Sequence, residues 1–169
     1  NYKLQEDALD KLFFELLPSN EEISDILLKV ATLNDFYSTN IFSVYPVAEH
    51  ILSLKIDERL RQGDVTLVNE IQNVTINGVT RKFYSFSTKY CSHNSKEYPI
   101  YDSYVEKVLK YFRKTDKFSN FKNADLKDYQ KFKNIIIAFR EYYGLDEFNL
   151  KEIDQYLWQL GKEYFPNKY

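Results

Sequence analysis

The sequence predicts an all-α protein, a compact multi-helix bundle with room for one short β-hairpin near residues 74–81. Three observations favour this fold as a single helical domain over residues 1–169. The chain is 44% hydrophobic, which is enough for one core. Apolar residues recur at helical spacing along most of its length. It has four Gly and four Pro, so few breaks interrupt its elements.

In the first half of the chain, helical segments alternate with clear breaks. Apolar residues recur at helical spacing up to Pro18, which ends the first segment. Ser19 and Glu22 fit a capping box that opens the second helix. Gly63 can close the fourth helix, and Asp64 can cap the fifth. The helices expected in this half span residues 3–17, 19–33, 41–54, 56–63 and 65–72.

The segment NVTINGVTRKF is ambiguous. Asn77-Gly78 between β-branched residues is the strongest local signal for a β-hairpin, yet the flanking segments read as helix. A helix over residues 81–93 would turn its aromatic rings inward and place Lys82 and Lys89 on the opposite stripe. Further helices are expected over residues 101–114, 129–144 and 149–165, with a polar loop over 115–128.

Charge is distributed unevenly along the chain. The net charge of the whole chain is −2, but residues 1–80 carry −7, residues 81–133 carry +7 and residues 134–169 carry −2. One face of the folded chain would be basic if these segments stay apart, and a basic face can bind a polyanion. A solvated lysine-rich surface is the plainer alternative.

Several kinds of site are excluded by what the chain lacks. One Cys and two widely spaced His leave too few ligands for zinc, so we expect no metal and no cofactor. The four Gly are scattered singly, which excludes a phosphate-cradling loop. No apolar run approaches the ~20 residues that span a bilayer. We therefore expect no membrane partner and an intracellular, cytoplasmic location.

Two stretches, INGVTRK at residues 76–82 and YPIYDSYV at residues 98–105, resemble the core of the helix-hairpin-helix DNA glycosylase superfamily. In that family a glycine-containing hairpin that ends in Lys is followed by a helix. A proline-containing segment then brings an Asp to the start of the next helix. Lys82 and Asp102 are separated by twenty positions, close to the family's usual interval. Thr80 stands where the family has a second glycine.

The resemblance implies a bundle of the glycosylase type and a DNA N-glycosylase, active in DNA repair or in defence against modified foreign DNA. Such an enzyme flips a damaged or modified base out of double-stranded DNA and cuts its N-glycosidic bond. The catalytic carboxylate would be Asp102, which stabilises positive charge on the sugar. A nucleophilic amine would come from Lys82, or from Lys89 if the alignment shifts. The residues expected to contact DNA are Gly78, Thr80, Arg81, His93 and Lys96.

Each of these residues also has a plainer interpretation. Asp102 could simply cap the helix that follows it, and Lys82 and Lys89 could be solvated. A second hypothesis is therefore a non-catalytic helical module that binds nucleic acid or an acidic protein through the basic segment 81–133. A toxin-like RNase that uses His93 is a weaker third. The base recognised and the oligomeric state stay open.

Overall fold

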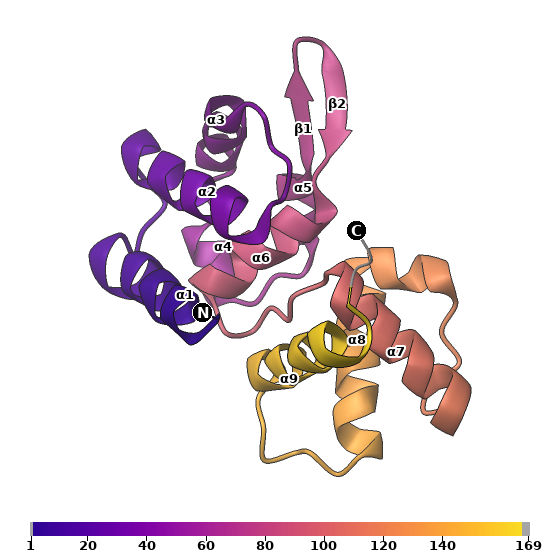
Figure 1. Ribbon diagram of the computed structural model, residues 1–169. Helices are drawn as coiled ribbons and strands as arrows, with labels where there is room; N and C mark the ends of the chain where they lie inside the picture. The colour runs from indigo at the N-terminus through magenta and orange to yellow at the C-terminus, as the bar shows by residue number, and fades with distance from the viewer. Residues whose placement is uncertain (1, 167–169) are drawn as a thin grey trace. The chain divides into compact units, whose positions relative to one another are not determined.

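The computed structural model describes residues 2–166 and is mostly helical (Figure 1). This part of the chain contains nine α-helices, one π-helical and one 3-10 segment, and one antiparallel sheet of two strands. The all-α fold class is therefore confirmed, with the short hairpin at the expected place. None of the helices in the described residues is both long enough and apolar enough to span a membrane.

Packing divides the chain into two compact units, Asn1–Ser95 and Lys96–Tyr169, which we call unit 1 and unit 2. Each unit has its own set of buried apolar side chains. The single domain expected over residues 1–169 stays a prediction, and each unit is described by itself.

Unit 1 is a group of six helices that carries a β-ribbon. Its elements are α1 (Tyr2–Asp10), the π-helical η1 (Lys11–Leu16), α2 (Ile23–Tyr37), α3 (Val44–Leu54), α4 (Asp57–Arg61), α5 (Thr66–Gln72), β1 (Asn73–Ile76), β2 (Val79–Lys82) and α6 (Tyr84–Asn94). Helix α2 packs against α3 and α6, and α5 packs against α6. Fully buried Ile26, Val47, Ile51 and Leu67 form part of the core between these helices.

Local signals set some boundaries in unit 1 and fail at others. Gly63 has a φ of +66° at the turn after α4, and Asp64 Oδ1 accepts the Thr66 N–H at 3.0 Å, both as expected. The Ser19 capping box is wrong, because α2 starts at Ile23 without a side-chain cap. The carbonyl of Ser19 instead accepts a hydrogen bond from a buried lysine described below.

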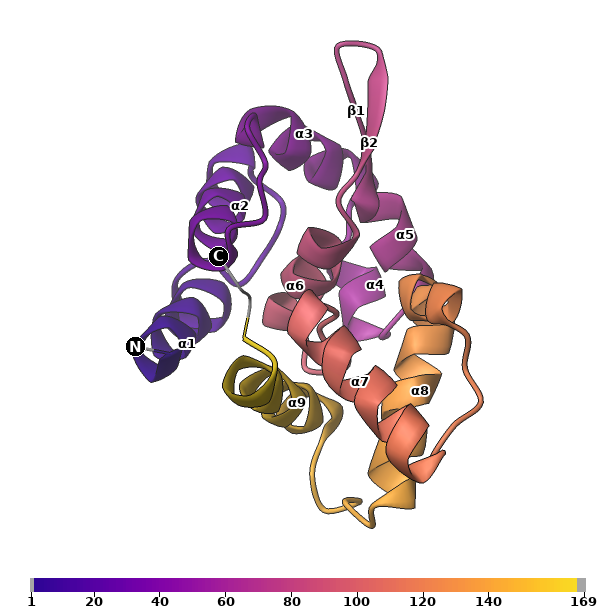
Figure 2. The same cartoon turned by 45° about the vertical axis from the view of Figure 1, so that its right-hand side comes forward.

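Strands β1 and β2 form a ribbon that stands away from the helices of unit 1 in both views (Figure 1 and Figure 2). Ile76 pairs with Val79, so Asn77 and Gly78 form a two-residue turn. Their φ angles of +52° and +77° are left-handed, which explains the Asn-Gly pair. All four residues of β2 are exposed.

Unit 2 is helical throughout its regular elements. These are α7 (Ser103–Asp116), the 3-10 segment η2 (Asn123–Lys127), α8 (Tyr129–Tyr142) and α9 (Leu150–Tyr164). Asn149 and Glu152 form the expected capping box at the start of α9. The polar loop predicted over residues 115–128 is wrong in part, because η2 lies within it and buries Leu126.

Helices α7 and α9 approach each other closely at Gly161. A Cβ at this position would lie 2.6 Å from the Cβ of Tyr104 and 2.8 Å from its carbonyl oxygen. Since backbone cannot yield as a flexible side chain can, a residue without Cβ is needed at this crossing.

Candidate functional site

Helix α6 is unusual because its sequence is polar and yet it is buried on all sides. Every residue from Phe86 to His93 is buried. The polar side chains in this run are Ser87, Thr88, Lys89, Ser92 and His93. The outward polar stripe predicted for this helix is therefore wrong. Charged and polar side chains are seldom buried without specific partners, so α6 is where a functional site in unit 1 is expected.

Lys89 lies near the middle of α6, with only 4% of its surface exposed. Its Nζ donates to Ser85 Oγ at 3.0 Å, one turn earlier on the same helix. The same Nζ lies 4.6 Å from the ring centroid of Tyr37, which comes from the end of α2. The Nζ of Lys89 therefore lies between a serine hydroxyl and an aromatic face.

His93 stands one turn after Lys89 and meets the same tyrosine. Its Nε2 lies 2.8 Å from the Tyr37 hydroxyl, which donates to Glu6 Oε1 at 3.2 Å. Because a hydroxyl has one proton to donate, the bond with His93 is best assigned as Nε2–H donating to the Tyr37 oxygen. Glu6, Tyr37 and His93 thus form a hydrogen-bonded chain that ends beside Lys89, and such a chain can relay a proton.

A second lysine of unit 1, Lys29 in α2, is fully buried. Its Nζ donates to the carbonyl oxygens of Leu17 at 3.0 Å and Ser19 at 3.3 Å, and to Asn94 Oδ1 at 3.1 Å. Burial lowers the pKa of Lys29 to about 8, against the opposing effect of two nearby carboxylates. These three bonds tie the chain before α2 to the end of α6, so Lys29 has a structural role.

Asp102 belongs to unit 2, where it is the N-cap of α7. Its Oδ1 accepts the N–H groups of Tyr104 and Val105, each at 3.0 Å, and 7% of its surface is exposed. The extended segment before it is anchored by the Ile100 N–H, which donates to Asp154 Oδ2 at 2.7 Å. Asp102 therefore caps α7, as its plainer interpretation predicted. The glycosylase interpretation also places this Asp at the start of a helix.

The other predicted site residues lie on elements other than α6, the helix that carries Lys89 and His93. Gly78 occupies the ribbon turn, and Thr80, Arg81 and Lys82 lie on exposed β2. Lys82 is therefore not on the helix that carries Lys89, which corrects the prediction of a shared stripe. Lys96 is exposed in the turn after α6 and is the first residue of unit 2.

The basic segment 81–133 is divided between the two units. Lys89 is buried within it, and Lys110 and Lys131 form ion pairs with Glu106 and Asp125. Its excess positive charge is therefore partly internal and partly neutralised, and the exposed cations that it gives to unit 1 are Arg81 and Lys82 on the ribbon.

Cys91 is fully buried on α6, and burial raises the pKa of its thiol well above the usual range. A thiol kept protonated in this way is a poor nucleophile and a poor metal ligand. Within residues 2–166, no group of three or more His, Cys, Asp and Glu side chains is arranged to hold a metal ion.

Of the predicted residues, the structure brings Lys89 and His93 together around Tyr37. Sequence reasoning missed Tyr37 and Glu6, because they lie 56 and 87 positions from His93 and no local motif marks them. A weak signal was present in the run Phe86–His93 of α6, where five polar residues interrupt an apolar pattern formed by Phe86, Tyr90 and Cys91.

The fold and the buried polar helix define a small, mostly helical protein with a polar cluster inside its N-terminal unit. Comparison with known proteins matches residues 1–98 to the family model HI_0787_N, described as an N-terminal domain, and this range nearly coincides with unit 1. An uncharacterized protein of Haemophilus influenzae (strain Rd) is 56% identical over 146 residues, which cover 85% of this chain and 70% of that protein. The chain belongs to the HI_0787_N family. No solved structure matches it.

Proposed function

We propose that this chain is an intracellular DNA N-glycosylase of the helix-hairpin-helix type, with Lys89 as its nucleophile. The observation that carries the proposal is the burial of Lys89 under the Tyr37 ring. A lysine attacks carbon only as the neutral amine, and desolvation favours that form. Lys82 is exposed on β2 and is not desolvated in this way, so Lys89 is the better candidate.

In the proposed reaction the neutral Nζ of Lys89 attacks C1′ of the deoxyribose. The electron pair of the C1′–N bond leaves with the base, which takes up the proton that Nζ loses. The sugar ring then opens to an imine on Lys89, and water later releases the lysine. The resemblance by itself gives Asp102, in unit 2, the role of stabilising positive charge on the sugar, and this role is a separate claim from that of Lys89.

The free protein must change locally for this reaction, because Lys89 is 4% exposed. Tyr37, which covers the ammonium, is itself partly exposed and comes from the last turn of α2. Opening Lys89 to a substrate requires the Tyr37 ring, at least, to move. Ser38 follows with a φ of +51°, so the backbone already turns away from the helix there.

The proposal is tested by base release from duplexes that carry uracil, oxidised, alkylated or hypermodified bases, with alkali to reveal abasic sites. Asp102→Asn is the decisive variant, because Asn caps a helix as well as Asp but has no charge. We expect base release by the native protein and a loss of about a hundredfold in Asp102→Asn at unchanged stability. No base release from any duplex, or equal base release by the variant, would refute the proposal that the protein is a DNA N-glycosylase.

The exposed ribbon supports a second candidate, a non-catalytic nucleic-acid-binding module. A two-stranded ribbon fits the major groove, and Arg81 and Lys82 of β2 are exposed. Duplex binding without base release would favour this module. In that case Arg81→Ala with Lys82→Ala should lower the slope of affinity against salt by about two, while Lys3→Ala with Lys11→Ala in the same unit should not.

A further inference from the structure

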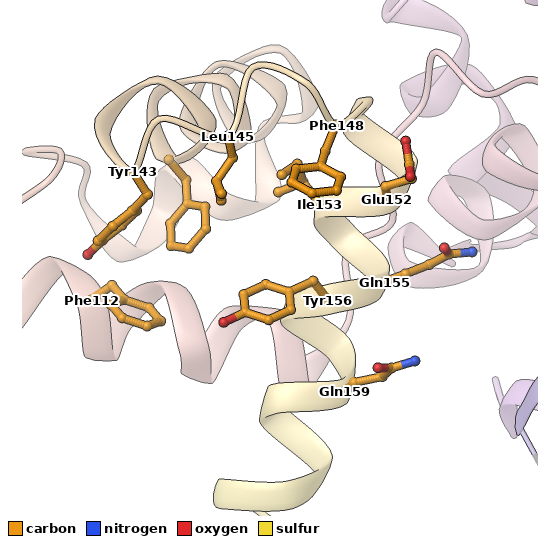
Figure 3. Close-up of a pocket in the computed structure, with 10 residues that line it drawn as sticks. Phe112, Tyr143, Leu145, Phe148, Glu152, Ile153, Gln155, Tyr156 and Gln159 are labelled. Carbon is orange, nitrogen blue, oxygen red and sulfur yellow. The ribbon is translucent and has the colours of Figure 1, made fainter.

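Unit 2 contains a pocket that takes no part in the proposed DNA chemistry. Its cavity volume is about 620 Å³, and it lies between α8, the start of α9 and Phe112 of α7 (Figure 3). Five of the ten residues around it are aromatic. Sites for small molecules typically enclose roughly 300–1,000 Å³ and are lined mainly by apolar and aromatic side chains. In size and lining this pocket therefore fits a small ligand.

The floor of the pocket is a packed set of rings. Phe112, Phe139 and Tyr143 pack with ring centroids 4.6 to 5.4 Å apart. The Tyr143 hydroxyl donates to Asp116 Oδ2 at 2.5 Å, and burial together with this bond raises the pKa of Tyr143. The hydroxyl therefore stays protonated, and the ring stays fixed without a ligand.

The loop between α8 and α9 is fixed as well. Gly144 has a φ of +65°, and the Leu145 N–H donates to the Arg140 carbonyl at 2.8 Å, which closes the end of α8. Arg140 Nη1 reaches back to the carbonyl of Phe148 at 3.4 Å. With the capping box of Asn149, these bonds hold the Phe148 wall in position, so the pocket is preformed.

Two aromatic walls of the pocket are open to water. Phe148 is 39% exposed and Tyr156 is 50% exposed, and Figure 3 shows both rings beside the open space. Covering exposed aromatic surface around a preformed pocket lowers the free energy, and a flat aromatic ring of a ligand can stack against either wall.

The charge around the pocket indicates which kind of ligand would cover these rings. Glu152 is the charged residue among those that line it, and acidic Asp146 and Glu147 lie in the adjoining loop. Glu152 Oε1 accepts the Asn149 N–H at 3.1 Å, and its Oε2 has no hydrogen bond within the described residues. The faces of the surrounding rings are also electron-rich, so they attract cations. We propose that this pocket binds a planar aromatic cation.

The test titrates the full chain with thioflavin T, a planar aromatic cation, and with anilinonaphthalene sulfonate, an aromatic anion of comparable size. We expect saturable binding of one cation per chain and weaker binding of the anion. Tyr156→Ala should weaken cation binding about tenfold by removing one wall. Tyr45→Ala, an equally exposed tyrosine of α3 in unit 1, is the control and should change nothing.

Glu152→Gln separates the charge from the shape of the pocket. Gln can replace Glu in a capping box, so α9 should keep its start, as circular dichroism and the thermal midpoint would verify. We expect the variant to bind the cation several-fold less tightly and the anion no less tightly. The proposal is overturned if the cation does not bind saturably, if Tyr156→Ala binds it unchanged, or if Glu152→Gln weakens both dyes equally.

Discussion

Units 1 and 2 differ in where they depart from the rule of apolar inside and polar outside, because unit 1 buries more polar side chains and unit 2 exposes aromatic rings beside a pocket. Within the described residues, seven of the ten buried polar side chains lie in unit 1, two of them lysines. In unit 2 the exposed large apolar side chains are all aromatic: Tyr111, Tyr142, Phe148, Tyr156 and Tyr164. Buried polar groups suit chemistry, whereas exposed rings suit binding, so the two units are candidates for different tasks.

The two buried lysines of unit 1 sharpen this comparison. Lys29 has its ammonium directed at two carbonyl oxygens and an amide oxygen, which fixes the chain around it. Lys89 donates to a serine hydroxyl and lies under a partly exposed tyrosine ring. The same residue type, equally hidden from water, is thus a structural tie at one position and a candidate nucleophile at the other.

The largest expected effect on stability comes from Lys29→Ala. It leaves a cavity and removes the donor from three acceptors, so we expect the free energy of unfolding to fall by about 3 kcal/mol. Urea unfolding measures the loss, and exposed Lys3→Ala is the matched control, expected to change little. A similar loss in both variants would contradict the structural role of Lys29.

Unit 2 should respond most strongly at its helix crossing. Gly161→Ala places a methyl group 2.6 Å from the Tyr104 Cβ, and we expect it to lower the free energy of unfolding by about 2 kcal/mol. Gly144→Ala is the comparison, with open space but a φ of +65°, and should lose about 1 kcal/mol. If Gly161→Ala is neutral or stabilising, α7 and α9 do not approach as closely as described.

The pH dependence of stability isolates the charge on Lys29. The folded pKa of about 8 lies below the ordinary value of 10.5, so between these values the unfolded chain binds more protons and stability rises with pH. Relative to Lys29→Met, the native protein should gain about 1 kcal/mol between pH 7 and pH 9.

Measuring this gain as a difference between two proteins removes other titrations. Burial raises the pKa values of Tyr90 and Cys91, which lowers stability at high pH in both proteins alike. A difference that stays flat or falls between pH 7 and pH 9 would show that Lys29 keeps an ordinary pKa.

A smaller effect distinguishes the two roles of Asp102. Asp102→Ala removes the acceptor of two amide N–H groups and should lower the free energy of unfolding by about 1 kcal/mol. Asp102→Asn should lose only a few tenths of a kcal/mol. Thermal unfolding of both variants checks this, and an equal loss in the two would mean that the charge, not the cap, matters for folding.

Features set by neighbouring residues were predictable from the sequence. Asn77-Gly78 predicted the ribbon turn, Asn149 and Glu152 predicted a capping box, and Asp102 was expected at a helix start. Each depends on hydrogen bonds or φ angles within a few residues, so the pattern is local. Ser19 shows the limit of such reasoning, because Lys29, ten positions further along the chain, donates to its carbonyl and α2 starts at Ile23 without a side-chain cap.

Features set by packing between elements were not predictable. Lys89 was expected on an outward stripe because lysine usually is, but α6 is covered on all sides. His93 and Tyr37 are 56 positions apart in the sequence, and their contact joins the last turns of α6 and α2. The aromatic pocket of unit 2 likewise combines side chains from three helices and a loop, and no single segment indicates it.

Trapping with borohydride tests the central claim most directly, because it needs no variant that could fail to fold. The native protein is incubated with a duplex that carries a base which the protein releases. The mixture is then reduced with borohydride, the protein is digested, and the peptides are mapped by mass spectrometry. If Lys89 is the nucleophile, the sugar remnant is found on the peptide that contains Lys89. A remnant on Lys82 or another lysine, or no covalent complex from a duplex whose base is released, would contradict the assignment.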